Sequence, residues 1–253
     1  MLGEGELARP LIQNDAAHGR LRPAYDIRGQ DFNLADAPIP AFKLLDMTRY
    51  DCITVQTSRG CPWRCTRCTS SILLTRKYKK KPAARMLAKI DRIQSLWSRL
   101  LMEFADDNSF INRAYWHELL PELAKPRIRW LTKTDLSIYQ DDELLHKMRK
   151  AGCAQVLIGF ESPTAEGLGG VERRKDSKRQ RFAKYKRAIR CIQGYGIMVN
   201  ACFRVGLMAM AQNSLMRLLI SWLTRRRGTC RSLANAFPRH AFASRSEEHT
   251  SEL

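Results

Sequence analysis

From residue 51 onward, the spacing of apolar and polar positions predicts strands that alternate with helices. Short apolar runs predict buried strands over residues 52–56, 101–105, 128–131, 153–160 and 196–207. Between these runs, apolar residues recur at helical spacing and predict helices over residues 83–100, 115–124, 141–150 and 177–193. Strands separated by helices of this length imply right-handed crossovers and a parallel sheet, so the predicted fold class is α/β.

Two of these helices carry further signals. The helix over residues 141–150 has acidic residues in its first turn and basic residues in its last, which matches the dipole of a helix. Gly152 follows it and suits the C-cap, because glycine adopts a positive φ without steric cost. The helix over residues 177–193 is expected to turn its apolar residues inward, namely Phe182, Tyr185, Ala188, Ile189 and Ile192.

The first 50 residues lack this alternation. Residues 1–20 predict a turn followed by a short amphipathic helix, which suits the last unit of an α/β domain. Residues 21–50 contain Pro23, Pro38 and Pro40 with little periodicity, and they are therefore expected to form a linker.

Length and composition are those of a globular protein that can bury a full core. No apolar run is long enough to cross a bilayer, and the N-terminus lacks the apolar segment of a signal peptide. Eight cysteines without a secretion signal argue for a reducing compartment, so we expect a cytoplasmic location and metal use instead of disulfides. Five cysteines are scattered, and we interpret them as small buried apolar residues: Cys52, Cys153, Cys191, Cys202 and Cys230.

The formal net charge of +19 raises the question of nucleic-acid binding. Part of the excess lies in residues 76–81, and part in the basic stretch over residues 172–187. Charge runs of this kind usually form solvated faces, and the sequence has no helix-turn-helix, zinc-finger or aromatic-interleaved basic motif. Nucleic acid is therefore not an expected partner.

Three cysteines lie within eight residues after the first predicted strand. Cys61, Cys65 and Cys68 have the spacing Cys-x3-Cys-x2-Cys inside the segment TSRGCPWRCTRCTSS. Such short gaps let one loop fold its sulfurs around a single centre, and clustered thiolates select Fe–S clusters, zinc or Cu(I). A structural zinc site normally closes with four ligands, and no fourth Cys or His follows at a matching distance. Three ligands leave one metal position open for another molecule.

This spacing after an apolar strand resembles the signature of the radical S-adenosylmethionine (SAM) enzymes. The resemblance implies that Cys61, Cys65 and Cys68 ligate three irons of a 4Fe–4S cluster, whose fourth iron is chelated by SAM. It also implies a partial parallel (β/α) barrel and reductive cleavage of SAM to a 5′-deoxyadenosyl radical. One residue departs from the family pattern, because Arg67 precedes the third cysteine where the family usually has an aromatic residue.

Polar residues collect where the predicted strands end, which is where ligands gather in parallel sheets. By resemblance to the family, the segment after the second strand contacts SAM, and Asp106, Asp107 and Asn108 occupy that place. Glu161 and Ser162 end a Gly-Phe-Glu-Ser stretch that is similar to the family's fourth-strand motif, which implies polar contacts to SAM there as well. For Asn108 and Ser162, a helix N-cap or loop solvation is the alternative.

The N-terminal segment resembles the end of the cobalamin-binding domain that precedes the core in one large radical SAM subfamily. On that resemblance, residues 1–20 are a remnant of the cobalamin domain, residues 21–50 a linker and residues 51–207 the radical SAM core. The resemblance implies cobalamin as a cofactor of the full-length parent, and methylation or radical cyclisation of an unidentified small molecule. It also implies an external reductant such as a flavodoxin or ferredoxin.

The β/α pattern fails after residue 207. Residues 245–253 (RSEEHTSEL) match the translation of a common sequencing-library adapter, so we expect that tail to be foreign to the protein. Residues 208–244, read in a shifted frame, permit sequences similar to those that the family carries after its fifth strand. We therefore expect a frameshift near Leu207, a truncated barrel without its sixth strand, and an exposed edge at the fifth strand.

Three alternatives stay open. A zinc-stabilised, basic nucleic-acid-binding protein predicts stoichiometric zinc and salt-dependent binding. A catalytically inactive fragment predicts cluster assembly without deoxyadenosine formation. An electron-transfer Fe–S protein without SAM needs a fourth ligand, which the sequence does not offer.

Overall fold

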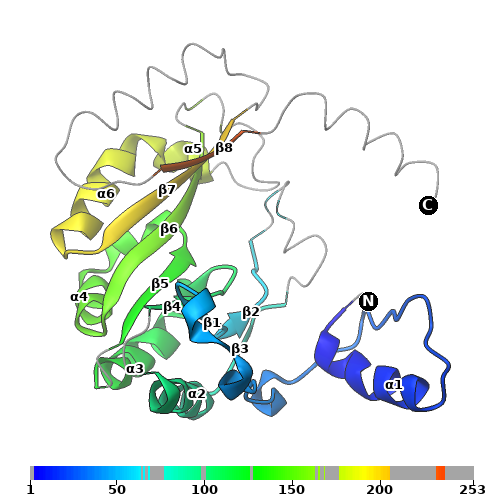
Figure 1. The fold of residues 1–253 in the computed structure, drawn as a ribbon. Coiled ribbons are helices and arrows are strands. Elements are labelled where there is room, and N and C mark those ends of the chain that lie inside the picture. The colour runs from blue at the N-terminus through cyan, green and yellow to red at the C-terminus, as the bar shows by residue number, and fades with distance from the viewer. Residues whose placement is uncertain are drawn as a thin grey trace, which may run out of the picture.

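The computed structural model describes residues 3–63, 65, 68, 77–97, 101–125, 128–162, 165, 168, 177–205 and 232–236. In this part of the chain, the main sheet has six strands, all parallel, in the order β1-β4-β5-β6-β7-β8 (Figure 1). Their bounds are β1 Ile53–Val55, β4 Leu101–Phe104, β5 Arg129–Thr134, β6 Cys153–Glu161, β7 Met198–Val205 and β8 Ser232–Ala236.

Helices alternate with these strands as the sequence predicts. They are α2 Ala83–Leu96, α3 Arg113–Ala124, α4 Asp142–Lys150, and the pair α5 Ser177–Arg181 and α6 Tyr185–Gly194. In Figure 1, α2, α3, α4 and α6 lie along one side of the sheet, as in the outer layer of a (β/α) barrel. The predicted parallel α/β sheet is therefore confirmed.

The pairing register brings the carboxyl ends of the strands to one edge. Val55 at the end of β1 pairs with Phe104 at the end of β4, and Phe104 pairs with Thr132 of β5. Thr134 at the end of β5 pairs with Ile158 near the end of β6. The loops that follow β1, β4, β5 and β6 therefore meet at this carboxyl edge, which is the usual ligand-binding edge of such sheets.

A cluster of large aromatic side chains fills the core beneath that edge. Phe104 of β4, Trp116 of α3 and Trp130 of β5 are fully buried, and their ring centroids lie 5.0 to 6.2 Å apart. Both indole N–H groups find backbone acceptors, Trp116 at the carbonyl of Ser109 and Trp130 at that of Ala151. The cluster thus fixes α3 and the segment after β4 against the sheet.

A second, two-stranded sheet stands beside the first and was not predicted. β2 (Ser58–Arg59) pairs antiparallel with β3 (Lys79–Lys80), with Ser58 opposite Lys80. Strands of two residues are too short to show the alternation of polar and apolar positions on which strand prediction depends. This β2–β3 hairpin brackets the segment that holds the three clustered cysteines.

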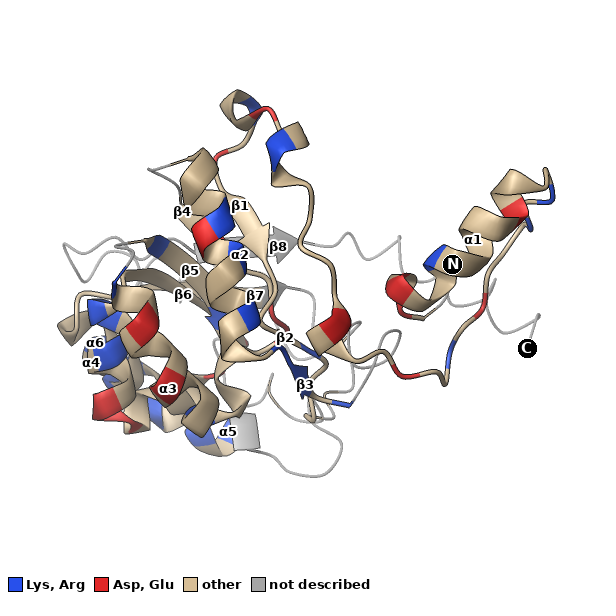
Figure 2. Ribbon diagram, turned by 90° about the horizontal axis from the view of Figure 1, so that it is seen from below, with Lys and Arg blue, Asp and Glu red and all other residues tan. Residues whose placement is uncertain are grey.

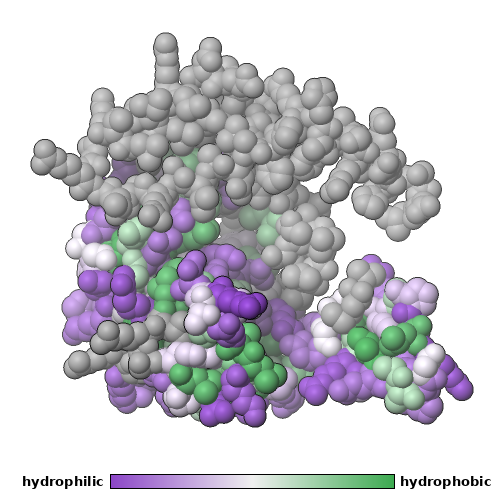
Figure 3. All heavy atoms as spheres, in the orientation of Figure 1, coloured by the Kyte–Doolittle hydropathy of each residue, from purple (hydrophilic) through white to green (hydrophobic). Residues whose placement is uncertain are grey.

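The N-terminal helix α1 (Gly5–Ala17) confirms the helix predicted for residues 1–20, and it lies apart from the helices that cover the sheet (Figures 1 and 2). Residues 21–50 contain three short 3-10 turns, η1 Leu34–Asp36, η2 Phe42–Leu44 and η3 Met47–Arg49, and their role as a linker stays a prediction. Apolar groups are exposed on the N-terminal unit, at the right of Figure 3. Leu11 and Leu21 are among them, with 41% and 64% of their surface exposed.

The predicted helix over residues 177–193 is broken. A 3-10 turn, η8 (Phe182–Lys184), separates α5 from α6. Residues three apart are eclipsed in a 3-10 turn, which brings Phe182 beside Tyr185 with ring centroids 5.3 Å apart. Both rings pack against the core, so the expected inward direction of Phe182 and Tyr185 is confirmed although the continuous helix is not.

The expected exposed edge at the fifth strand is wrong. β8 pairs in parallel with β7, from Ala201 opposite Ser232 to Val205 opposite Ala236. The physical reason is that an uncovered β7 presents a row of free donors and acceptors, and the backbone of residues 232–236 pairs with them. Residues 206–231 and 237–253, which hold most of the expected frameshift and the whole expected adapter tail, lie outside the described residues.

Gly152, the predicted C-cap after α4, gives a first test of the fold. Its φ is +88°, and a Cβ there would lie 1.8 Å from the carbonyl oxygen of Ile128. We expect Gly152→Ala to lower the free energy of unfolding by about 2–4 kcal/mol, through left-handed strain and steric overlap. Urea unfolding measures this change.

Gly196 is the matched control, since it also precedes a strand and has a φ of +74°. A Cβ at Gly196 would meet the flexible side chain of Arg149 at 3.3 Å and no backbone atom at closer range. Gly196→Ala is therefore expected to cost only about 1–2 kcal/mol. Equal losses for the two variants would contradict the close backbone approach at Gly152.

Candidate functional site

The carboxyl group of Asp106, just after β4, is the centre of a buried hydrogen-bond network. Its Oδ1 accepts the backbone N–H groups of Thr57 at 2.8 Å and Ser58 at 2.9 Å, which follow β1. Its Oδ2 accepts the Thr57 hydroxyl and lies 3.0 Å from Oγ of Ser109. Because Asp106 is only 1% exposed, these bonds are shielded from water and join the ends of β1 and β4 firmly.

The network continues to β5 through two hydroxyl groups. Oγ of Ser109 lies 2.5 Å from Oγ1 of Thr132, which lies 3.1 Å from the carbonyl oxygen of Phe104. The three contacts from Asp106 to Phe104 need three hydrogens, and the two hydroxyls supply two. If all three contacts are hydrogen bonds, a proton on the Asp106 carboxyl group supplies the third. Burial raises the pKa of Asp106, against the opposing effect of its hydrogen-bond donors, which agrees with this count.

The cysteine loop (residues 60–76) starts at a second carboxylate of the same segment. Oδ2 of Asp107 accepts the N–H of Gly60 at 3.1 Å. Gly60 has a φ of +82°, a left-handed conformation that favours glycine. The buried Cys61 follows directly. The first turn of the cysteine loop is thus fixed to the segment after β4.

The three cysteines of this loop interact electrostatically. Burial raises the pKa of the Cys61 thiol to about 11, and the charges of Cys65, Cys68 and Asp107 add to the rise. Cys65 and Cys68 are partly buried, and the N–H of Cys68 donates to the carbonyl of Cys65 at 3.4 Å. A cation among the sulfurs would reverse the effect on Cys61, because it stabilises the thiolate form.

In the described residues, no group of three Cys, His, Asp or Glu side chains surrounds one possible metal position. Residues 64, 66, 67 and 69–76 of the loop lie outside the described residues, and so does the family departure at Arg67. The donor chemistry of the loop fits an Fe–S cluster, because the loop supplies three soft thiol ligands. The charges of Cys65 and Cys68 already act on the pKa of Cys61. The ligand roles of Cys61, Cys65 and Cys68 stay predictions.

Asn108 places an unsatisfied acceptor at the carboxyl edge. Its Nδ2 donates to Oδ2 of Asp135 at 2.8 Å, while its buried Oδ1 has no hydrogen-bond partner in the described part of the chain. Asp135 follows β5 and caps the 3-10 helix η6 (Leu136–Gln140) by accepting the N–H of Ser137 at 2.7 Å. Asn108 itself precedes η5 (Ser109–Ile111) without a side-chain capping bond, so the structure does not support the N-cap alternative. A buried carbonyl oxygen without a donor is costly, which favours a ligand or water at this point.

The other predicted contacts lie at the end of β6, which Glu161 closes and Ser162 follows, on the far side of β5 from Asn108. Glu161 has a φ of +65°, the one positive φ of a non-glycine residue in the described ranges. The register between β6 and β7 shifts between Gly159 and Glu161, and the N–H of Ser162 donates back to Phe160 at 2.8 Å. A left-handed glutamate costs about 1–2 kcal/mol, and strain of this kind clusters at functional sites.

The interpretation of the basic run over residues 76–81 as a solvated face holds for only part of it. Lys77 and Lys80 are exposed, whereas Lys79 and Lys81 turn inward, and residue 76 lies outside the described residues. Arg59 of β2 pairs with Glu4 at 2.8 Å and with Glu6 at 2.7 Å, and Lys79 of β3 also pairs with Glu4. Lys81 is only 6% exposed. Strand β3, blue near the centre of Figure 2, folds the run back against β2, where carboxylates of the N-terminal segment neutralise part of its charge.

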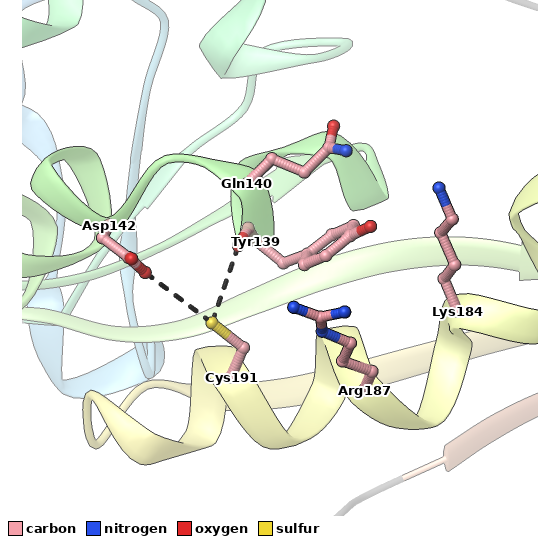
Figure 4. A pocket seen from close by; sticks show the side chains of 6 residues that line it. All are labelled: Tyr139, Gln140, Asp142, Lys184, Arg187 and Cys191. Atoms are coloured by element: carbon pink, nitrogen blue, oxygen red, sulfur yellow. Dashed lines mark hydrogen bonds between the residues drawn. The ribbon is translucent and has the colours of Figure 1, made fainter.

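A separate groove of about 410 Å³ lies in the outer layer between η6 and α6 (Figure 4). Sγ of Cys191 lies 3.6 Å from the carbonyl oxygen of Tyr139 and 3.9 Å from Oδ1 of Asp142. The lining residues are Tyr139, Gln140, Asp142, Lys184, Arg187 and Cys191. The predicted cluster and SAM residues are not among them, so this groove is distinct from the carboxyl edge.

The scattered cysteines differ in burial. Cys153 is fully buried as expected, but Cys52, Cys191 and Cys202 are partly exposed. The interpretation as buried apolar residues is therefore wrong for these three, because Cys191 faces the groove on α6 and Cys52 precedes β1. Cys230 lies outside the described residues.

Comparison with known families identifies the superfamily of the chain. Residues 55–210 match the model of the Radical SAM superfamily. The chain belongs to the radical SAM superfamily. The match contains the whole cysteine loop and the strand ends after β4, β5 and β6, and it stops where the β/α pattern of the sequence fails. The predicted family and the partial parallel (β/α) barrel are confirmed.

Relatives of this radical SAM chain include methyltransferases. An uncharacterized methyltransferase of Synechocystis sp. is 32% identical over 175 residues, which cover 66% of this chain and 32% of that protein. The hopanoid C-2 methylase of Rhodopseudomonas palustris is 29% identical over 180 residues, which cover 67% and 33%. The chain thus spans about a third of the length of these curated relatives.

Solved structures of the same superfamily share the fold. The cobalamin-dependent S-adenosylmethionine radical enzyme OxsB superposes with a TM-score of 0.63 at 16% identity, over 96% of this chain and 38% of that one. The radical SAM methyltransferase TsrM from Kitasatospora setae, with cobalamin and a 4Fe–4S cluster bound, gives 0.55 at 17% identity over 68% and 34%. Among the described residues, no helix is long and apolar enough to cross a membrane.

The hydrogen count around Asp106 leads to a test of its protonation. Asp106→Ala leaves buried donors of Thr57 and Ser58 without an acceptor, and we expect it to lower the free energy of unfolding by about 3 kcal/mol. Asp106→Asn keeps the acceptor for both N–H groups and offers hydrogens to Ser109, so it is expected to cost less than half as much. Urea unfolding of both variants makes the comparison.

Asp107→Asn serves as the control. In the described residues, Asp107 accepts one hydrogen bond, from Gly60, and we expect the substitution to cost less than about 1 kcal/mol. If Asp106→Asn is as damaging as Asp106→Ala, the carboxyl group is ionised in the folded protein and the hydrogen count is wrong.

Proposed function

We propose that this chain binds a 4Fe–4S cluster through Cys61, Cys65 and Cys68 and binds SAM at the adjoining carboxyl edge of the sheet. A cluster of this type supplies the electron that cleaves SAM to methionine and a 5′-deoxyadenosyl radical. One electron enters from outside the chain for each SAM cleaved, so the proposal includes a reductant of the flavodoxin or ferredoxin class. The observation that carries the proposal is the direct link between the cysteine loop and the predicted SAM segment.

The side chains of Asp106 and Asp107 position the cysteine loop relative to the predicted SAM segment. Asp106 holds the end of β1 and Asp107 holds Gly60, so the segment after β4 sets where the cysteine loop begins. With its oxygens engaged, Asp106 acts as a positioning residue, and a direct contact from Asp106 to SAM stays a prediction. The loop and the SAM segment therefore keep a fixed spacing, which orients two bound groups toward each other.

We assign the SAM contacts to residues whose polar atoms can still accept a hydrogen bond or interact with a charge. Oδ1 of Asn108 is a buried acceptor that lacks a donor in the described residues, and the ammonium or ribose hydroxyl of a ligand supplies one. Asp107 adds negative charge beside it, which favours the positively charged SAM. Glu161 and Ser162 lie at the same edge, at the end of β6, and we propose that they contact SAM there.

We extend the proposal to the longer parent protein. Relatives include hopanoid methylases and an anaerobic magnesium-protoporphyrin IX monomethyl ester cyclase of Synechocystis sp., which is 26% identical over 167 residues. These relatives support methylation or radical cyclisation of a small molecule as the parent reaction, and the cobalamin bound in OxsB and TsrM supports a cobalamin-dependent one. On this view residues 1–20 are the remnant of a cobalamin domain, residues 21–50 its linker and residues 51–207 the radical SAM core.

Anaerobic reconstitution with iron and sulfide tests the cluster. We expect a brown protein with about four irons per chain, and formation of 5′-deoxyadenosine from SAM when dithionite is the reductant. Cys61→Ala, Cys65→Ala and Cys68→Ala are each expected to lose the iron and the activity, because three ligands are the minimum for this site. Cys191→Ala, on the outer groove, is the control and is expected to keep both.

The possible failures are distinct. Brown protein without deoxyadenosine would leave the cluster assignment standing and show that this chain is an inactive fragment. Colourless protein with one tightly bound zinc would overturn the assignment of the cysteine loop and support the zinc-stabilised alternative.

Asn108 gives a separate test of SAM binding. We expect Asn108→Ala to weaken SAM binding to the reconstituted chain about 10-fold, through loss of one buried hydrogen-bond acceptor. Equilibrium dialysis measures the affinity, and iron content shows whether the cluster is intact. Gln140→Ala, in the outer groove, is expected to bind SAM normally. An unchanged affinity of Asn108→Ala with a full cluster would remove Asn108 from the SAM site.

A further inference from the structure

Two lysine side chains are buried beside the cysteine loop. Lys81 follows β3 and Lys89 lies on α2, and each has only 6% of its surface exposed. The backbone N–H of Lys81 donates to the carbonyl of Thr57 at 2.8 Å, which holds it at the base of the loop. Lys89 stands on the apolar face of α2, beside Ile90 and three residues after Met86. A lysine in such a position is normally found on the solvent side of a helix.

The charges of Lys89 and of the Arg59 guanidinium both act on the ammonium group of Lys81. A protonated lysine has hydrogens to donate and no lone pair, so two such groups cannot bond directly. Burial, followed by the charge of Lys89, lowers the pKa of Lys81 to about 7. The site therefore gathers positive charge at a place where water screens it poorly.

No carboxylate in the described part of the chain forms an ion pair with Lys81 or Lys89. Glu6 is nearby but pairs with Arg59, and Asp106 accepts the donors that fix the end of β1. The cysteine loop contains no Asp or Glu at all. The two lysines therefore have no ion-pair partner among the described residues, and Asp106 and Glu6 act on Lys81 without forming an ion pair with it.

We infer that Lys81 and Lys89 form a binding site for an oxyanion, a phosphate, sulfate or carboxylate group that bridges their two ammonium groups. An oxyanion accepts several hydrogen bonds at once, so one such group satisfies both lysines and neutralises their repulsion. The inference stands on the two lysines and their surroundings alone, and it holds or fails independently of the proposed cluster and SAM chemistry.

Thermal unfolding with sulfate as the probe tests the site. We compare the full chain in sodium sulfate and in sodium chloride of equal ionic strength, at a pH below the pKa of Lys81. At a sulfate concentration roughly ten times its Kd, the expected rise in Tm is about 3–5 °C. Chloride at the same ionic strength is expected to give no comparable rise, because it bridges the two ammonium groups poorly.

Two substitutions of Lys89 separate site binding from the general effect of sulfate. Lys89→Met keeps the packing of the stem and removes one ammonium, so the sulfate response is expected to disappear. Lys89→Glu gives Lys81 an internal counter-ion, and we expect a higher Tm in chloride together with loss of the sulfate response. Lys125→Met is the control and is expected to respond like the unmodified chain, because the Lys125 side chain is 70% exposed.

Two results would overturn the inference. An equal response to sulfate in Lys89→Met, Lys125→Met and the unmodified chain would mean that sulfate acts only by exclusion from the protein surface. In the second result, sulfate does not change the Tm of the chain at all, and the Tm in chloride rises as the pH increases above about 7. Because the unfolded chain then binds more protons than the folded one, that rise would show a neutral Lys81 accepting a hydrogen bond from Lys89.

The titratable groups that act on Lys81 or are acted on by it all enter the pH comparison: Lys89 of α2, Arg59 of β2, Asp106 after β4 and Glu6 of α1. Lys81→Met removes the titrating group while these four remain. A pH response that persists in Lys81→Met therefore belongs to another group and does not count against the oxyanion site.

A competition experiment identifies the source of the oxyanion. If the carboxylate of SAM occupies the site, SAM removes the sulfate response of the reconstituted chain, and Lys89→Met weakens SAM binding. If the natural ligand is a free anion, the sulfate response persists in the presence of SAM. Both outcomes require a sulfate response that depends on Lys89, and they differ only in the molecule that carries the charge.

Discussion

The buried carboxyl group of Asp106 is the constraint on which the candidate site depends. It collects donors from the end of β1 and from the turn after β4, and through Ser109 it reaches Thr132 of β5. A carboxyl group hidden from water is costly unless its hydrogen bonds are made, so the three strand ends must hold one arrangement. The cysteine loop starts within this arrangement, because Thr57 and Ser58 lead directly into it. Because the buried carboxyl group requires these hydrogen bonds, the position at which the cysteine loop begins is fixed.

A second theme is the uneven distribution of charge around the β2–β3 hairpin. Arg59 and Lys79 meet the carboxylates of Glu4 and Glu6, so the N-terminal segment serves as a counter-ion for one face of the hairpin. Lys81 lies just beyond those pairs and meets another lysine instead. Exposed ion pairs contribute little to stability, but partly buried ones of this kind fix the geometry of the segments that they join. The neutralised and the unneutralised lysines of one short run therefore have different roles.

Sequence reasoning succeeded where a signal was local. The periods of apolar residues located the helices and the five strands up to residue 205, and the spacing of Cys61, Cys65 and Cys68 identified the family. It failed where the outcome depended on distant partners. Residues 76–81 look like a uniformly solvated run from sequence because Glu4, which pairs with Lys79, lies 75 residues away. The exposed edge expected at β7 was wrong because a strand 27 residues after β7, Ser232–Ala236, pairs with it, and parallel pairing leaves no mark in either strand alone.

By itself, the sequence determined the α/β class, the order of strands and helices, the three-thiol donor set and the left-handed glycine after α4. These features follow from residue type and short-range spacing, which act within one or two turns of chain. Three outcomes depend on the tertiary structure. Asp106 is buried and bonds to several segments, Oδ1 of Asn108 lacks a donor among the described residues, and Lys81 and Lys89 are both buried and interact. Those outcomes depend on which segments the sheet register brings together, and hydrogen bonds and charge pairs across 49 residues of sequence have no local signature.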